Sequence, residues 1–179
     1  MLTFLRPFRI VLPLVATALL VGCSSDGNKN PFEVTVERCP AVAVVGGTGS
    51  LTRFRGTERN AEDILYEATI TGTRLQCNQG DDVVSDVAFE IVAQRGPALR
   101  GEADVALPYF VAVLRDNSEI VAKDVYLARL HFSADAERAG TREIVRQRLP
   151  TIEQARRYDY EILLGFQLDP EDVTYNLLR

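Results

Sequence analysis

The 179-residue sequence contains no tryptophan, one histidine and one methionine. A single histidine, His131, leaves too few imidazole ligands for a typical copper or zinc site. The absence of tryptophan excludes the Cys…Trp…Cys core pattern of antibody domains. No Gly-x-Ser-x-Gly motif is present to mark a serine nucleophile. These absences argue against an enzyme and against a bound metal or cofactor.

Glycines cluster only once, in Gly46-Gly47-Thr48-Gly49, after an apolar run that ends at Val45. A dinucleotide-binding loop needs a helix behind it, because the pyrophosphate binds at the N-terminus of that helix. The residues that follow, Arg53-Phe54-Arg55-Gly56, show no helical periodicity. The glycines therefore predict a turn between two strands.

The longest apolar stretch near the N-terminus, residues 10–21, has about 12 residues and is shorter than the ~20 that a membrane-spanning helix needs. Arg6 and Arg9 precede it. A positive region, a short apolar core and a small residue are typical of a secretory signal peptide. The segment Leu20-Val21-Gly22-Cys23 also resembles the lipobox of bacterial lipoproteins.

This resemblance implies that residues 1–22 are a lipoprotein signal peptide and that Cys23 becomes the acylated N-terminus. Several acyl chains, palmitate among them, would then hold the protein in a membrane, because one chain alone binds only marginally. Ser24, in place of Asp, resembles the default for export to the outer membrane in Gram-negative bacteria. An ordinary secretory signal with an incidental cysteine is the alternative.

The rest of the chain divides into a short polar segment and one domain. Residues 24–30 contain no apolar side chain, so residues 23–31 are expected to be the lipidated cysteine and a flexible tether. Residues 32–179 are long enough for one periplasmic domain with a real core. Without Arg6 and Arg9, the net charge is near −7. An acidic domain without a basic stripe argues against nucleic acid as a partner.

Two cysteines remain after Cys23, at positions 39 and 77. The periplasm is oxidising, so a disulfide between Cys39 and Cys77 is expected. Two unpaired buried thiols are the alternative. A metal site is disfavoured because the two cysteines are far apart in sequence and lack the close pairs of zinc ligands.

Apolar residues alternate with polar ones in several short segments, and turn residues separate these segments. No long segment has helical periodicity. The pattern predicts an all-β, antiparallel β-sandwich of immunoglobulin or fibronectin-III type, with a barrel as the alternative. The expected strands cover residues 40–45, 50–55, 64–71, 83–93, 108–114, 120–132, 141–149 and 158–168.

Four local features refine this prediction. Residues 115–118 are expected to form a hairpin loop, and residues 133–140 a polar connection. The segment 141–149 is expected to be an edge strand, with a short helix as the alternative. Asp169-Pro170 has the composition of a helix start and predicts a short C-terminal helix.

Residues 138–157 form a basic segment, in which only Glu143 and Glu153 carry a negative charge. It could dock an anionic partner such as lipid headgroups, a polyanionic glycan or an acidic protein face. Edge strands also carry charges simply to prevent aggregation, which is the alternative. The candidate docking residues are Arg138, Arg142, Arg146, Arg148, Arg156 and Arg157.

The run Cys39-Pro40-Ala41-Val42-Ala43-Val44-Val45, the residues 46–54 after it and residues 108–113 resemble a group of uncharacterised outer-membrane lipoproteins of alphaproteobacteria. The resemblance implies a lipid-anchored protein on the periplasmic face of the outer membrane. It carries no activity that can be transferred to this chain.

We therefore expect a membrane-anchored periplasmic lipoprotein that acts as a non-enzymatic binding or scaffolding module of the cell envelope. Its expected partners are the membrane, through the acyl chains, and another envelope protein. The alternative is an envelope hydrolase or a small-ligand carrier with a pocket near His131.

Overall fold

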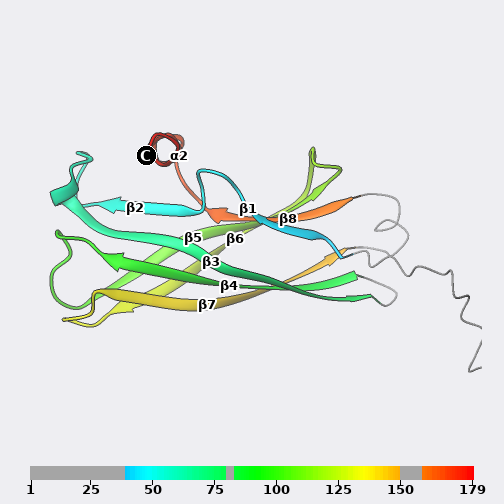
Figure 1. Cartoon of the computed structure of the whole chain (residues 1–179), viewed down its shortest axis with the longest axis horizontal. Coiled ribbons are helices and arrows are strands. Elements are labelled where there is room, and N and C mark those ends of the chain that lie inside the picture. The colour runs from blue at the N-terminus through cyan, green and yellow to red at the C-terminus, as the bar shows by residue number, and fades with distance from the viewer. Residues whose placement is uncertain (1–38, 80–82, 150–158) are drawn as a thin grey trace, which may run out of the picture. The chain divides into compact units, whose positions relative to one another are not determined.

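Short alternating segments form eight strands in the computed structural model, which describes residues 39–79, 83–149 and 159–179 (Figure 1). The predicted sites Cys23, Arg156 and Arg157 lie outside these described residues. The strands are β1 (Ala41–Val44), β2 (Ser50–Phe54), β3 (Ile64–Gln79), β4 (Val83–Arg95), β5 (Ala103–Arg115), β6 (Glu119–Phe132), β7 (Arg138–Leu149) and β8 (Tyr160–Phe166). A 3-10 helix, η1 (Ala61–Asp63), and the α-helix α2 (Pro170–Leu177) complete the described elements.

The strands form two four-stranded sheets that pack face to face, which confirms the predicted β-sandwich (Figure 1). Sheet A has the order β1-β8-β5-β6, and sheet B has the order β2-β3-β4-β7. Neighbouring strands are antiparallel except β1 and β8, which are parallel. The likeness to immunoglobulin domains is architectural, because these orders differ from the ABED and CFG sheets of that fold.

The core lies between the sheets and takes every second residue along most of the long strands, with β6 contributing only from Tyr126 onward. Phe89 of β4 meets Tyr109 of β5 edge to face, with ring centroids 5.2 Å apart. Such aromatic pairs add stabilisation beyond the area that they bury. The largest fully buried side chains are Tyr109, Phe89, Phe132, Phe166, Leu51, Ile91, Leu107, Ile162, Leu164, Val83 and Val87.

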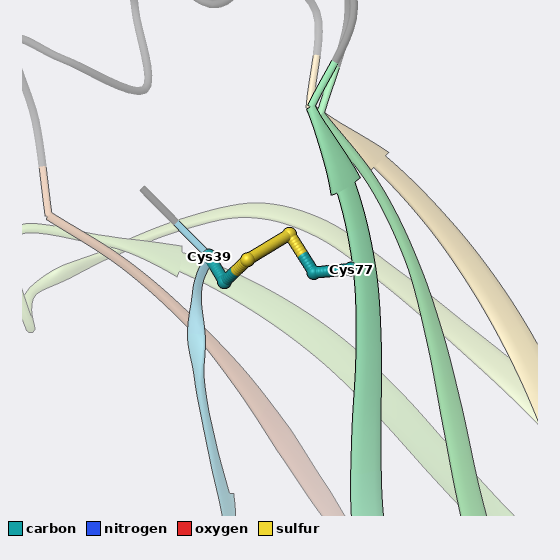
Figure 2. The surroundings of a disulfide bond; sticks show 2 residues. All are labelled: Cys39 and Cys77. Carbon is teal, nitrogen blue, oxygen red and sulfur yellow. A yellow bond between two sulfur atoms is a disulfide. The ribbon is translucent and has the colours of Figure 1, made fainter. Parts of the chain in front are cut away.

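The predicted disulfide between Cys39 and Cys77 is present (Figure 2). The two Cα atoms are 5.8 Å apart. Cys39 precedes β1 of sheet A, and Cys77 lies in β3 of sheet B. The bond therefore joins the two sheets, and it anchors the short edge strand β1 where the chain enters the sandwich.

The glycine cluster forms a turn, as predicted. The element that follows it is the strand β2 and not a helix. Gly47 has a φ of 76°, a left-handed backbone conformation that residues other than glycine rarely adopt. An added Cβ atom there would also lie 3.1 Å from Leu177 of α2. The turn is thus shaped to accept the C-terminal helix.

Several strands are longer than predicted, β3 and β5 by the most. β3 continues to Gln79, past the predicted end at Thr71. A bulge between Thr71 and Arg74 shifts the alternation of inward and outward residues by one position, so the pattern of residues 64–71 does not continue beyond it. Gly72, with a φ of 62°, forms this bulge. β5 begins at Ala103, before the predicted 108–114, and lies between β8 and β6, so it is a central strand of sheet A.

The segment 141–149 is the predicted edge strand and not the alternative helix. It starts earlier, at Arg138, so the predicted connection 133–140 was too long at its C-terminal end. The predicted hairpin loop is confirmed. Asp116 and Asn117 both have positive φ, as the tight turn between two twisted strands requires.

The predicted C-terminal helix is confirmed as α2, with Pro170 in its first turn. The backbone carbonyl of Asp169 accepts hydrogen bonds from Asp172 and Val173, and its side chain makes no capping bond. Asn176 donates to the carbonyls of Gly47 and Ser50, both at 2.8 Å. The helix therefore lies along β2, one edge of sheet B.

Candidate functional site: the outer faces of the two sheets

Four of the predicted docking arginines share the outer face of sheet B. The register of β7 against β4 places Arg138, Arg142, Arg146 and Arg148 opposite Gln94, Glu90, Asp86 and Val84. Val145 and Gln147, which alternate with them, are buried in the sandwich. The alternation of side chains along an edge strand thus places these arginines in one row. We call this outer face of sheet B the arginine face.

The row ends in a shallow hollow of about 420 Å³ near the disulfide. Arg146 and Arg148 line it, together with Asp86 and the disulfide-bonded Cys77. The Arg146 guanidinium makes two hydrogen bonds to the Asp86 carboxylate, at 2.7 and 2.9 Å. These bonds hold the pKa of Asp86 below its ordinary value and raise that of Arg146. The hollow therefore keeps a fixed guanidinium at its rim.

A second hollow of about 170 Å³ lies farther along the same face. Arg142 of β7 and Arg74 of β3 line it, with Glu90 of β4 between the two strands. Neither arginine forms an ion pair with any side chain in the described ranges. Both guanidinium groups can therefore bind an anion without breaking an existing pair.

Glu143 does not belong to the arginine face, although the sequence places it in the basic segment. It points into the sandwich, opposite Phe89. Its carboxylate accepts hydrogen bonds from the hydroxyls of Tyr109, at 3.1 Å, and Thr141, at 3.2 Å. Burial, followed by the charge and hydrogen bond of Glu143, raises the pKa of Tyr109 well above its ordinary value. An inward charge of this kind protects an edge strand from pairing with another chain.

We expect Tyr109→Phe to lower the free energy of unfolding by about 1 to 2 kcal/mol at neutral pH. The substitution leaves a half-buried carboxylate with one hydrogen bond fewer. Tyr126→Phe is the matched control, because the Tyr126 ring stacks on Tyr109 with centroids 5.4 Å apart. Urea unfolding of the three proteins measures the difference, and equal losses in both variants would contradict the role of the hydroxyl.

The same pair predicts a dependence on alkaline pH. The folded state holds the Tyr109 proton more tightly than the unfolded state, in which the pKa of tyrosine is about 10. The stabilisation from this group is therefore complete below about pH 10 and is lost as the pH rises further. The stability gap between the native protein and Tyr109→Phe should shrink above that pH, and a constant gap would argue against this coupling.

Part of the outer face of sheet A is apolar, in contrast to the arginine face of sheet B. The register of β5 with β6 and β8 places the outward apolar residues of these strands side by side. Val125 is 55% exposed and Leu127 is 50% exposed. We call this surface the apolar face; it comprises Pro108, Phe110, Leu114, Val125, Leu127 and Leu163, around the buried Ala112.

One cation lies over the middle of the apolar face. The Lys123 ammonium is 4.7 Å from the centre of the Phe110 ring, within the range of a cation–π contact. Exposed apolar patches with a polar rim are typical of surfaces that bind another molecule. No described segment covers this patch.

The edge of β6 is open beside the apolar face. Its first half, from Glu119 to Val125, is exposed on both sides, and within the described ranges only β5 pairs with the strand. The other three edges are each blocked: β1 has four residues, β2 lies under α2, and β7 carries the arginines and the inward Glu143. A long open edge can pair with an additional strand.

Sequence reasoning found the arginines and missed the apolar face. The signal was present in β5, where Pro108, Phe110 and Leu114 alternate with Tyr109 and other buried residues. Antiparallel strands with one solvated face normally alternate between apolar and polar. A strand that is apolar on both sides therefore indicates a second surface to be covered.

His131 lies on the outer face of sheet A, opposite Asp104. A hollow of about 370 Å³ lies beside it, as the alternative function requires. The Nδ1 atom is 2.8 Å from the Asp104 carboxylate, and Nε2 is 3.6 Å from that of Glu102. A general base needs one nitrogen directed at the nucleophile. Here both nitrogens face carboxylates, so the geometry favours a cationic imidazolium.

The hydrogen bond to Asp104, helped by the charges of Asp104 and Glu102, raises the pKa of His131 above its ordinary value. We expect a proton NMR titration to show this increase and Asp104→Asn to reverse most of it, toward about 6.5. Asp124→Asn, on the same strand as His131, is the control and should leave the titration unchanged. A native titration at or below 6.5 would refute the pairing.

Neither a membrane helix nor a metal centre appears in the parts of the chain that the structure covers. No helix there is long and apolar enough to cross a bilayer. In the same residues, no three side chains of His, Cys, Asp or Glu are grouped so that they could hold a metal ion.

Comparisons with protein-family models, with curated proteins and with solved structures found no match to this chain. The function therefore has to be argued from the two outer faces and the edge of β6.

Proposed function

We propose that the protein is a membrane-anchored lipoprotein of the cell envelope whose sandwich domain binds another envelope protein and catalyses no reaction. The proposed anchor is Cys23, in the lipobox-like segment that ends the apolar N-terminal stretch. The observation that carries the proposed binding role is the apolar face of sheet A next to the open edge of β6.

The partner that fits this surface is an extended segment with apolar side chains at every second residue. Its backbone would pair with the free edge of β6 and extend sheet A by one strand. Its apolar side chains would then continue the row formed by Val125 and Leu127. Main-chain hydrogen bonds supply affinity in this mode, and the side chains supply specificity.

Substitution of the exposed aliphatic residues tests this role. Val125→Lys combined with Leu127→Lys should weaken binding at least tenfold, because two charges would enter an apolar contact. Stability should change by less than about 1 kcal/mol, because both side chains are half exposed. The matched control is Val92→Lys with Ile144→Lys, which changes two exposed aliphatic residues on the outer face of sheet B.

Binding is measured by placing a photoreactive side chain at position 127 of the native lipidated protein in the envelope. The account predicts a crosslink to an extended, alternating segment of one envelope protein. The lysine pair on sheet A should abolish the crosslink, and the pair on sheet B should preserve it. If position 127 gives no crosslink, or if the lysine pairs on both sheets reduce the crosslink equally, this surface is not the binding site.

A further inference from the structure

We propose that the arginine face of sheet B docks on anionic phospholipid headgroups of the membrane that holds Cys23. This inference rests on the proposed lipid anchor and assigns an orientation to the domain. Sheet B would face the bilayer, and the apolar face of sheet A would face away from it, toward the protein partner.

The charge of the face is the first argument. Five arginines point outward from sheet B, against the carboxylates of Glu67, Asp86 and Glu90. The chain as a whole has a net charge of −5. Guanidinium groups bind phosphate through paired, charge-assisted hydrogen bonds. The outward arginines are Arg74, Arg138, Arg142, Arg146 and Arg148.

The point at which the chain enters the sandwich is the second argument. Cys39 is bonded to Cys77 (Figure 2). Cys77 lines the same hollow as Arg146 and Arg148. About fifteen residues separate Cys23 from Cys39, and a chain of that length spans at most ~58 Å in any conformation. A lipid on Cys23 would therefore keep this end of the domain within that distance of the membrane.

The charge on sheet A at the same end is the third argument. Asp116 and Asp159 are exposed at the β5–β6 hairpin and before β8. Asp124 is exposed on β6. Anionic headgroups repel these carboxylates and attract the arginines of sheet B. Among the described residues of the disulfide end, sheet A thus presents more carboxylates than sheet B, which makes sheet B the better fit to an anionic surface.

The absence of tryptophan makes a direct test possible. Ile144→Trp places one fluorescent reporter between Arg142 and Arg146, at a side chain that is 64% exposed. Val125→Trp places the control reporter on the apolar face. The lipidated full-length proteins are reconstituted in phosphatidylcholine vesicles with and without phosphatidylglycerol, and brominated lipids measure contact with the bilayer.

We expect quenching at position 144 only in vesicles that contain phosphatidylglycerol, and little quenching at position 125 in either. About 1 M salt, where the Debye length is ~3 Å, should reverse it. Arg74→Gln with Arg142→Gln should lower the ratio of docked to free protein about 25-fold, or about fivefold for each charge. Arg53→Gln with Arg129→Gln removes the same charge elsewhere and should have little effect.

The outcomes separate this inference from the proposed function. Mass measurement first establishes whether Cys23 carries the lipid, which tests the proposed anchor alone. With the lipid present, equal quenching in both vesicle types, or an equal loss in both arginine pairs, would overturn the docking. A response at position 144 to soluble polygalacturonate, without a response to vesicles, would assign the face to a polyanionic glycan and also overturn it.

Discussion

Cys39→Ser combined with Cys77→Ser is expected to lower the free energy of unfolding by about 4 kcal/mol. The bond closes a loop between residues that are 38 apart in sequence. In the chain-entropy model, a loop of this size accounts for about 4 kcal/mol at 25 °C. The loss should be concentrated at the start of sheet A, because β1 has four residues and pairs only with β8 among the described strands.

Urea unfolding of the oxidised protein, the reduced protein and the double-serine variant measures this effect. The reduced protein and the variant should agree, because both lack the same crosslink. A loss below about 1 kcal/mol would contradict the account, as would two thiols that alkylate in the native protein.

Gly96→Ala is expected to destabilise the domain by about 3 kcal/mol. An added Cβ atom would lie 2.2 Å from the backbone oxygen of Ile64 and 2.6 Å from its carbonyl carbon. The same oxygen accepts a hydrogen bond from Ala98, so it cannot move away freely. Overpacking against atoms that cannot move costs about 1 to 3 kcal/mol, and a clash with backbone belongs at the upper end of that range.

Gly46→Ala and Gly56→Ala are the matched controls. No atom lies within 4 Å of a Cβ atom at either position, and neither glycine has a positive φ. Both substitutions should change the free energy of unfolding by less than about 1 kcal/mol. If Gly96→Ala unfolds at the same urea concentration as the controls, the close approach of Gly96 to Ile64 does not constrain the fold.

Local patterns were enough to predict most strands, because half-buried strands repeat every second residue. The alternation within 158–168 correctly predicts β8, and the two remaining cysteines correctly predict the disulfide. Pro170 correctly marks the C-terminal helix. These features depend on neighbouring residues or on the number of cysteines.

Pairings between distant segments were not predictable in the same way. β1 and β8 lie at opposite ends of the described chain, and no local pattern indicates that they run parallel. Ile144 and Val145 are adjacent and both apolar, so either could face the core. The structure buries Val145, and this choice turns Glu143 inward and the arginines outward.

The contrast between the two outer faces is the main result for function. One face has an apolar patch beside an open strand edge, and the other carries a row of arginines that ends near the entry point of the chain. A domain held by a lipid can use the two faces at once, one toward a membrane and one toward a protein. Both proposed roles depend on the acylation of Cys23.

The most direct test is therefore the mass of the N-terminal peptide of the protein purified from the membranes of the organism that makes it. The account predicts a peptide that begins at Cys23, with a thioether-linked diacylglycerol on the sulfur and a fatty acid on the amine. A chain that begins at another residue, or a Cys23 with a free thiol, would contradict it.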